Sequence, residues 1–149
     1  MEELELLIAY VLFYGALEML YLKFMAPIYQ RNFEVVQGSG RNPNIQQRPY
    51  THLGWAVVAY IALFISVYRF VVRPIFIAST KRMMPTLYAN AANATLLAIA
   101  IYGVYNLTNL ATLRGYSPSI AALDTAWGIT AINVVAGACY ALKIWVTER

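Results

Sequence analysis

Four long apolar segments divide the chain, and most of its polar residues lie in the connections between them. The segments cover about residues 6–26, 52–73, 86–113 and 118–146. Each is close to or above the roughly 20 residues that a transmembrane helix needs to cross the hydrocarbon core. The pattern therefore predicts an all-α fold in which residues 1–149 form a single domain, a polytopic bundle of four transmembrane helices.

The connections contain clear signals for turns and helix ends. The longest, about residues 28–51, includes QGSGRNPNIQQRP, whose Gly, Pro, Asn and Gln residues are typical of an irregular, water-facing loop. Pro27 precedes this loop, and we expect the first helix to end there. Gly115 followed by Ser117-Pro118 predicts a helix stop and then an N-cap with a first-turn proline.

Polar and small residues recur within the segments at helical spacing, three or four residues apart. The stripe in the first segment is Tyr10, Tyr14, Glu18, Tyr21 and Met25. The stripe in the third is Ala91, Ala94, Ala98, Tyr102, Tyr105 and Asn109, with Asn106 at its margin. The stripe in the fourth is Ala121, Asp124, Gly128, Ala131, Val135 and Ala138. Small residues permit close helix approach, so we expect these stripes to face the interior of the bundle.

Composition supports a membrane protein and excludes several other classes. The chain is 60% hydrophobic and 12% charged, about half the charge of a soluble domain. Its net charge is +4, but the basic residues are scattered, which excludes a nucleic-acid partner. The single cysteine, Cys139, excludes an intramolecular disulfide and a cysteine-based zinc site, and we expect it to be buried as a small hydrophobe.

Connectivity brings polar residues from all four segments to one depth. Alternate helices run in opposite directions, so the first and third segments end at the membrane face at which the second and fourth begin. The polar residues expected to meet there, towards one leaflet, are Glu18, Tyr21, His52, Tyr105, Asn106, Thr108, Asn109, Asp124 and Trp127.

Glu18 and Asp124 are the members of this cluster whose insertion into the membrane costs the most free energy. A carboxylate at the bilayer centre costs about 2.5–3.5 kcal/mol on insertion scales, whereas one interhelical hydrogen bond contributes about 0.6 kcal/mol. Each carboxylate therefore needs several partners, protonation or nearby water, and Arg31 and Arg114 are candidate counter-ions. Two interpretations stay open: a polar clamp that fixes the helix register, and a binding or proton-linked site open to one membrane face.

A second group of basic residues lies at the opposite face. Arg69 and Arg73 are four residues apart near the end of the second segment. They are interpreted either as interfacial anchors or, together with Lys81 and Arg82 of the next connection, as a site for lipid headgroup phosphate. The basic residues on the two faces differ by one charge, which places both termini in the cytoplasm by the positive-inside rule.

The sequence contains no recognisable catalytic motif. HExxH, histidine-rich boxes, Cys-x-x-Cys, Gly-rich phosphate loops and GxSxG are all absent. One histidine cannot build the multi-histidine sites of membrane desaturases or hydroxylases. We therefore expect no catalytic residues, no metal and no cofactor, and the sequence offers nothing that identifies an enzyme.

Two motifs carry a family resemblance over nearly the whole chain. VYNLTNLATLRGY (104–116) and LDTAWG (123–128) resemble the signature of an uncharacterised family, a domain of unknown function, of small predicted four-helix membrane proteins known mainly from bacteria. FVVRPIF (70–76) and Glu18 with Tyr21-Leu22 also resemble it. Two positions at which the family usually has aspartate are occupied by Glu18 and Asn106 in this chain. The family's connection between the first and second helices is shorter than the one in this chain. The resemblance implies the architecture and no particular activity.

Two functions remain as expectations. The first is a structural or interaction subunit of a larger membrane-associated assembly, whose partners are membrane lipids and either other membrane-protein subunits or further copies of the chain. The alternative is an enzyme or transporter that handles a lipid or small solute in a one-leaflet polar pocket around Glu18 and Asp124. A pore formed by an oligomer is a third, weaker option.

Overall fold

The computed structural model describes residues 3–37, 50–79 and 83–147, and these form four helical spans. The first is α1 (Glu3–Gln37), and the last is α6 (Pro118–Thr147). The second consists of α2 (Tyr50–Val67), a π-helical turn η2 (Tyr68–Val72) and α3 (Arg73–Ile77). The third consists of α4 (Met83–Ala98), a π-helical turn η4 (Ile99–Gly103) and α5 (Val104–Thr112). All four spans are long and apolar enough to cross a membrane, which confirms the predicted all-α, multi-pass architecture.

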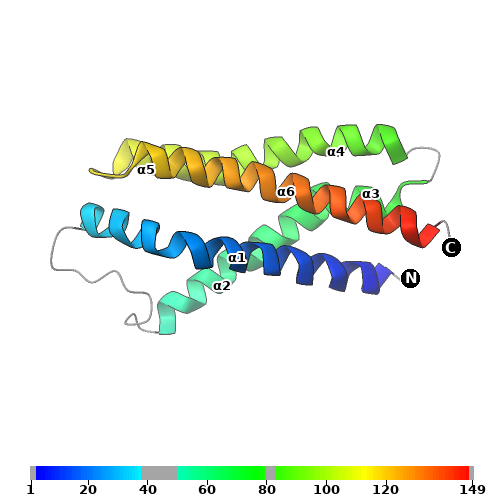
Figure 1. Ribbon diagram of the computed structural model, residues 1–149, viewed down its shortest axis with the longest axis horizontal. Coiled ribbons are helices and arrows are strands. Elements are labelled where there is room, and N and C mark those ends of the chain that lie inside the picture. The colour runs from blue at the N-terminus through cyan, green and yellow to red at the C-terminus, as the bar shows by residue number, and fades with distance from the viewer. Residues whose placement is uncertain (1–2, 38–49, 80–82, 148–149) are drawn as a thin grey trace.

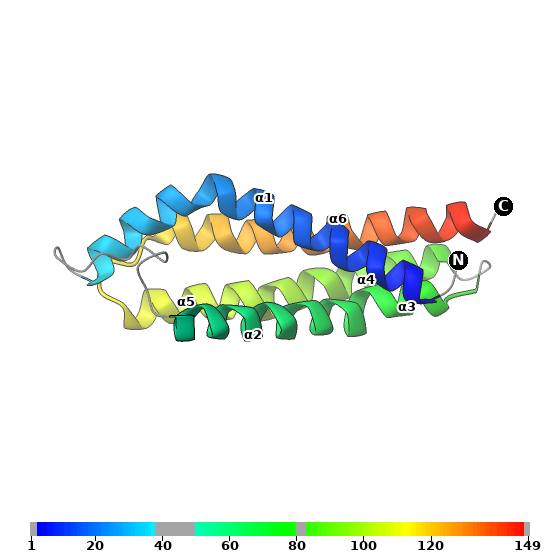
Figure 2. The same ribbon diagram turned by 90° about the horizontal axis from the view of Figure 1, so that it is seen from below.

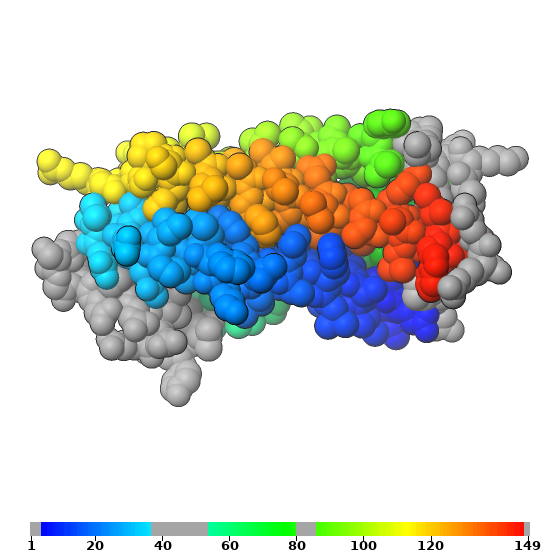
Figure 3. All heavy atoms as spheres, viewed as in Figure 1, coloured from blue at the N-terminus to red at the C-terminus, as the bar shows by residue number. Residues whose placement is uncertain are grey.

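The bundle is organised around α6, which contacts every other span. The start of α1 and the end of α6 lie at the same end of the molecule, as expected for an even number of spans (Figure 1). The turned view places α1 and α6 in one layer and the other two spans in a second layer (Figure 2). On one face of the molecule α1 and α6 lie against each other (Figure 3).

Small residues bring α4 and α6 together. Ala94 and Ala98 of α4 and Ala131 and Val135 of α6 are all fully buried in one core cluster. Side chains of this size let two helix backbones approach closely, which is how helices associate when no water drives them together. The interior face predicted for α6 is thus confirmed, and Cys139 is buried in the same cluster as expected.

Aromatic contacts join α1 to the second span at one end only. The Tyr10 hydroxyl donates to the carbonyl of Phe64 at 2.8 Å, and the ring centroids of Tyr14 and Phe64 are 4.8 Å apart. The interior stripe predicted for α1 is confirmed here, since Tyr10 and Tyr14 are both buried. Residues 54–59, near the start of α2, are in contrast all exposed. The two helices therefore lie together at one end and leave room between them at the other.

The predicted end of the first helix at Pro27 is wrong, because α1 continues through this proline to Gln37. A proline in a helix interior removes one backbone hydrogen bond, but here the next turns are held by packing. Tyr29 and Val36 lie against a second core cluster that includes Tyr116 and Ile120. About ten residues assigned to the first connection are therefore helical, and its remainder, 38–49, lies outside the described residues.

The π-helical turn η4 changes which residues of the third span face inwards. Ala94 and Ala98 are buried as predicted, but Asn106 is 1% exposed whereas Tyr105 is 53% exposed. A π turn inserts one residue into the helical repeat, so the inward position moves from 105 to 106. The prediction that Tyr105 lies on the inward stripe and Asn106 at its margin is wrong for this reason.

Substitution of Ala131 by leucine tests the close contact between α4 and α6. Ala131 is fully buried, so the added atoms must displace the neighbouring helix, and we expect the free energy of unfolding to fall by about 1–3 kcal/mol. The same change at the exposed Ala126 of α6 is the control and should have little effect. Thermal unfolding in mild detergent measures both. Equal tolerance of the two substitutions would contradict close packing at this contact.

Candidate functional site

Asn106 is the centre of a hydrogen-bonded network that joins the last two spans. Its amide nitrogen donates to Asp124 Oδ2 at 2.7 Å and to the carbonyl of Tyr102 at 2.8 Å. Its amide oxygen accepts a hydrogen bond from the Tyr116 hydroxyl at 2.7 Å. Burial raises the pKa of Tyr116, which keeps this hydroxyl protonated and able to donate. One buried side chain thereby fixes α5, the following turn and α6 relative to one another.

The turn after α5 positions Tyr116. Gly115 has a φ of +83°, a left-handed conformation that glycine adopts without strain. The Asn32 side chain of α1 donates to the Gly115 carbonyl at 3.3 Å, which ties the turn to the first helix. The helix stop predicted at Gly115 and the start of α6 at Pro118 are confirmed.

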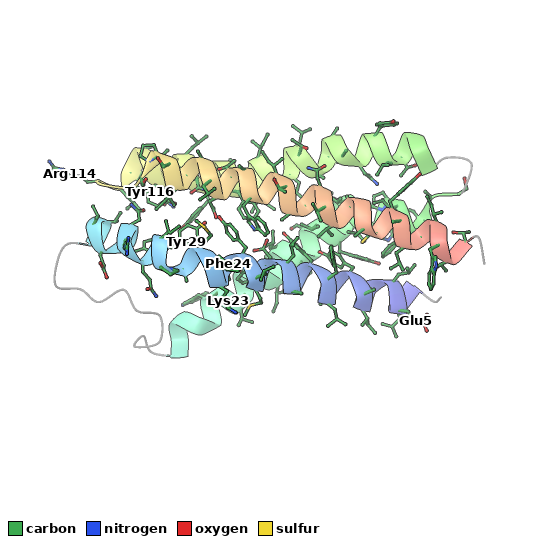
Figure 4. All side chains as sticks on the ribbon, in the orientation of Figure 1. Glu5, Lys23, Phe24, Tyr29, Arg114 and Tyr116 are labelled. Carbon is green, nitrogen blue, oxygen red and sulfur yellow. The ribbon has the colours of Figure 1, made fainter. Side chains whose placement is uncertain are left out.

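Asp124 also receives a hydrogen bond from the first helix. The Tyr29 hydroxyl donates to Asp124 Oδ1, and it lies 2.8 Å from the Tyr21 hydroxyl. Tyr29 and Tyr116 both point towards the space between α1 and the start of α6 (Figure 4). Each oxygen of the Asp124 carboxylate therefore has one neutral donor, Oδ1 from α1 and Oδ2 from α5.

Glu18 is almost fully buried, at 4% exposure, and its two donors reach the same oxygen. Tyr102 and Trp127 donate to Oε1 at 3.3 and 3.2 Å respectively. Within the described ranges, Oε2 receives no hydrogen bond. The Tyr21 ring stacks on Trp127 with 4.2 Å between centroids and an interplanar angle of 1°, which fixes the indole that donates to Glu18.

Gly128 of α6 is what allows Tyr102 to reach Glu18. A Cβ atom at Gly128 would overlap the Tyr102 ring, so the ring rests directly on the helix backbone. Through Tyr102 the two carboxylates belong to one network, because its hydroxyl donates to Glu18 while its carbonyl accepts from Asn106.

A cavity of about 490 Å³ lies beside this network, at the end where α1 and α2 diverge. Its lining residues come from all four spans and the turn after α5: Glu18, Tyr21, Leu22, Tyr29, Phe33, Ala56, Ala59, Tyr60, Leu63, Ile101, Tyr102, Tyr105, Tyr116 and Asp124. Glu18 and Asp124 are the charged groups among them, and the remainder are aromatic or aliphatic. The cavity thus has an apolar wall on α2 and a polar wall on α1 and α6.

The structure brings together five of the residues predicted for the polar cluster: Glu18, Tyr21, Asn106, Asp124 and Trp127. Tyr105 lines the cavity although it is half exposed. Thr108 is exposed and Asn109 is half-buried, and neither side chain bonds to a carboxylate. The side chain of His52 lies outside the described residues. A functional role for the cluster stays a prediction.

The counter-ions expected for the carboxylates are not found beside them. Arg31 and Arg114 are both exposed, and Arg114 extends away from the end of the bundle (Figure 4). The donors to Glu18 and Asp124 within the described ranges are instead neutral tyrosine, tryptophan and asparagine side chains.

Three tyrosines of the site, Tyr29, Tyr102 and Tyr116, were not predicted as members of the cluster. Tyr29 fell in the expected loop, whose helical continuation no local signal indicated. Tyr102 lay on the predicted inward stripe, and Tyr116 closes the VYNLTNLATLRGY motif. A buried carboxylate requires several donors, so the sequence allows Tyr102 to be assigned to Glu18, whereas Tyr116 donates to Asn106 and not to a carboxylate.

The basic group expected at the opposite face is described only in part. Arg69 is exposed, with its guanidinium carbon 6.0 Å from the centroid of the Phe70 ring, and Arg73 is partly buried. Lys81 and Arg82 lie outside the described residues. A headgroup-phosphate site there stays a prediction.

Comparison with known proteins gives one match. The model of a family described as "Predicted membrane protein (DUF2177)" matches residues 4–141, which is nearly the whole chain. No curated protein and no solved structure matches. The family match confirms the resemblance that the motifs indicated, and it attaches no activity to the site.

Replacement of Gly128 by alanine tests how Tyr102 is positioned. The added methyl group overlaps the Tyr102 ring, so we expect a loss of about 1–3 kcal/mol in the free energy of unfolding. Gly137→Ala on the same helix is the matched control, because a Cβ there meets open space. Alanine at position 137 should leave the free energy of unfolding unchanged or raise it by up to about 1 kcal/mol. Similar unfolding temperatures for the two variants would contradict the proposed contact.

Proposed function

The chain belongs to the DUF2177 family of predicted membrane proteins, and we propose that it binds an amphiphilic molecule, a lipid or a lipid-like solute, in the cavity between α1 and α2. The observation that carries this proposal is the cavity of about 490 Å³ with two carboxylates in its wall. Binding sites for small molecules occupy roughly 300–1,000 Å³ and combine an apolar lining with a few placed polar groups.

The two walls of the cavity match the two parts of an amphiphile. Ala56, Ala59 and Leu63 of α2 offer an apolar surface to a hydrocarbon chain. Glu18 and Asp124 lie on the opposite side, where a polar head can exchange hydrogen bonds with them. The cavity lies at the end of the bundle where α1 ends and α2 begins, which gives a lipid access from one leaflet.

A polar clamp alone explains less of the structure. The bond between Asn106 and Asp124 fixes helix register whether or not anything is bound. Protein interiors, however, are packed to the density of organic crystals and leave few voids larger than a water molecule. A clamp needs no cavity beside it, whereas a binding site does.

Both termini are proposed to face the cytoplasm. The start of α1 and the end of α6 lie at one end of the bundle (Figure 1), and the positive-inside rule supports placing that end inside.

Filling the apolar wall tests the binding function. Phenylalanine at Ala59 projects into the cavity, and we expect it to weaken binding of an alkyl amphiphile at least about tenfold, or roughly 1.4 kcal/mol. Ala62→Phe, at an exposed position of α2 outside the cavity lining, is the matched control and should bind as the unmodified protein does. Quenching of Trp127 fluorescence by a dodecyl maltoside brominated on the chain carbons next to its head group, in lipid nanodiscs and in protein carrying Trp55→Phe and Trp145→Phe, measures this. Equal quenching in all three proteins would contradict a site in this cavity.

A second candidate function, a subunit of a larger membrane assembly, is supported by the outer face of α6. Thr130, Val134, Gly137 and Ala141 are exposed there at helical spacing, and a Cβ at Gly137 would meet open space. Small residues on a lipid-facing surface permit close approach of another helix. The partner is either a second copy of the chain or another membrane protein.

Isoleucine at Gly137 tests the assembly candidate. We expect the bulky side chain to separate the helices and shift the protein towards monomer, as counted by single-molecule photobleaching in nanodiscs. Gly54→Ile on α2, where a Cβ also meets open space, is the control and should leave the stoichiometry unchanged. An unmodified protein that is monomeric in nanodiscs and that co-purifies with no other membrane protein from its native membrane would rule out this candidate.

A further inference from the structure

We propose that the polar end of the cavity recognises a cation, so that the amphiphile bound there carries an amine or quaternary ammonium head. This inference rests on the proposed binding function and names the chemical class of the ligand. Its basis is the charge balance and the aromatic character of the polar wall.

The polar wall holds two acidic side chains, and none of the described residues places a basic side chain beside them. Glu18 and Asp124 line the cavity, and no Lys, Arg or His is among the residues known to line it. The nearest basic residue along α1, Lys23, is exposed on the outside of the helix. Buried carboxylates are normally paired with a cation, so a cationic ligand would supply the partner that the described residues do not provide.

Glu18 has an oxygen available for such a ligand. Both of its donors, Tyr102 and Trp127, reach Oε1, and no described residue donates to Oε2. The Glu18 side chain is 4% exposed and borders the cavity, so a ligand in the cavity can approach this carboxylate. An ammonium N–H can donate to Oε2, and a quaternary ammonium can pair with the carboxylate by charge alone.

Aromatic rings also line the cavity. Tyr21, Tyr60, Tyr102 and Tyr105 all line it. The face of an aromatic ring attracts a cation, and aromatic cages are the usual way in which proteins recognise quaternary ammonium groups. A wall that combines tyrosines with carboxylates is therefore suited to an organic cation.

Other ligand classes fit less well. An anionic head would meet two carboxylates and no described basic partner. A bare metal ion requires several hard ligands in one place, and the described ranges contain no group of three or more His, Cys, Asp or Glu side chains that could hold one. A cavity of about 490 Å³ is also much larger than an ion needs.

The test compares three amphiphiles that share a dodecyl chain brominated next to the head group and differ in that head group: trimethylammonium, maltoside and sulfate. Binding is measured by quenching of Trp127 in nanodiscs of zwitterionic lipid, in protein carrying Trp55→Phe and Trp145→Phe. Each affinity is calculated from the concentration of the amphiphile in the bilayer. Binding to the cavity is the part of the Trp127 quenching that Ala59→Phe abolishes. We expect the ammonium compound to bind at least about tenfold tighter than the maltoside, and the sulfate more weakly than either.

Glu18→Gln then tests the role of the carboxylate, since the amide keeps an oxygen for Tyr102 and Trp127. It should remove the preference for the ammonium compound over the maltoside. Glu5→Gln is the control, because Glu5 is exposed near the start of the same helix (Figure 4). If Glu18→Gln does not fold, the relative affinities of the three amphiphiles for protein that keeps Glu18 decide whether the cavity prefers a cationic head group.

The outcomes separate this inference from the function on which it rests. Equal affinity for ammonium and maltoside, both lost in Ala59→Phe, would overturn the cationic head group and leave amphiphile binding intact. An ammonium preference that persists in Glu18→Gln would also overturn recognition by that carboxylate. If Ala59→Phe reduces Trp127 quenching for none of the three compounds, the binding function itself is overturned.

Discussion

Burial of two carboxylates inside an apolar bundle is the constraint on which the rest of the structure depends. A carboxylate costs about 2.5–3.5 kcal/mol at the bilayer centre and less towards the interface, and one hydrogen bond offsets only about 0.6 kcal/mol of this cost. Several donors must therefore converge, and they come from different helices. Tyr29 of α1 and Asn106 of α5 reach Asp124, while Tyr102 and Trp127 reach Glu18. Three of the four spans must meet at this depth for the network to form, so it stabilises one particular packing of the helices.

The irregular backbone of the third span follows from the same requirement. In an uninterrupted α-helix the inward face that contains Ala98 would continue at Tyr105. The π-helical turn η4 moves Asn106 inwards instead, where its short amide reaches Asp124 at 2.7 Å. Gly128 then provides the space that the Tyr102 ring occupies against α6. A π turn in one helix and a glycine in the facing helix together permit the two carboxylates to share one network.

The sequence predicts those parts of the structure that depend on helical spacing and connectivity. The four spans, the inward stripes of α1 and α6, and the meeting of Glu18, Asn106 and Asp124 all follow from these two sources. What it does not predict depends on tertiary contacts. α1 passes Pro27 because Tyr29 and Val36 pack against the second core cluster, and the shift from Tyr105 to Asn106 requires a π turn that no local residue pattern signals.

The position of the cavity follows from where the helices are joined. Tyr10, Tyr14 and Phe64 tie α1 to α2 at one end, while the network around Asp124 ties α1 to α5 and α6 at the other. Residues 54–59 of α2 are exposed, and no described contact includes them in either group. The polar wall is thus fixed by hydrogen bonds from several helices, whereas the apolar wall belongs to a helix held mainly at its far end. If the cavity binds an amphiphile as proposed, it would select the head group strictly and accept hydrocarbon chains of different length, because only the head group would meet groups whose geometry is fixed.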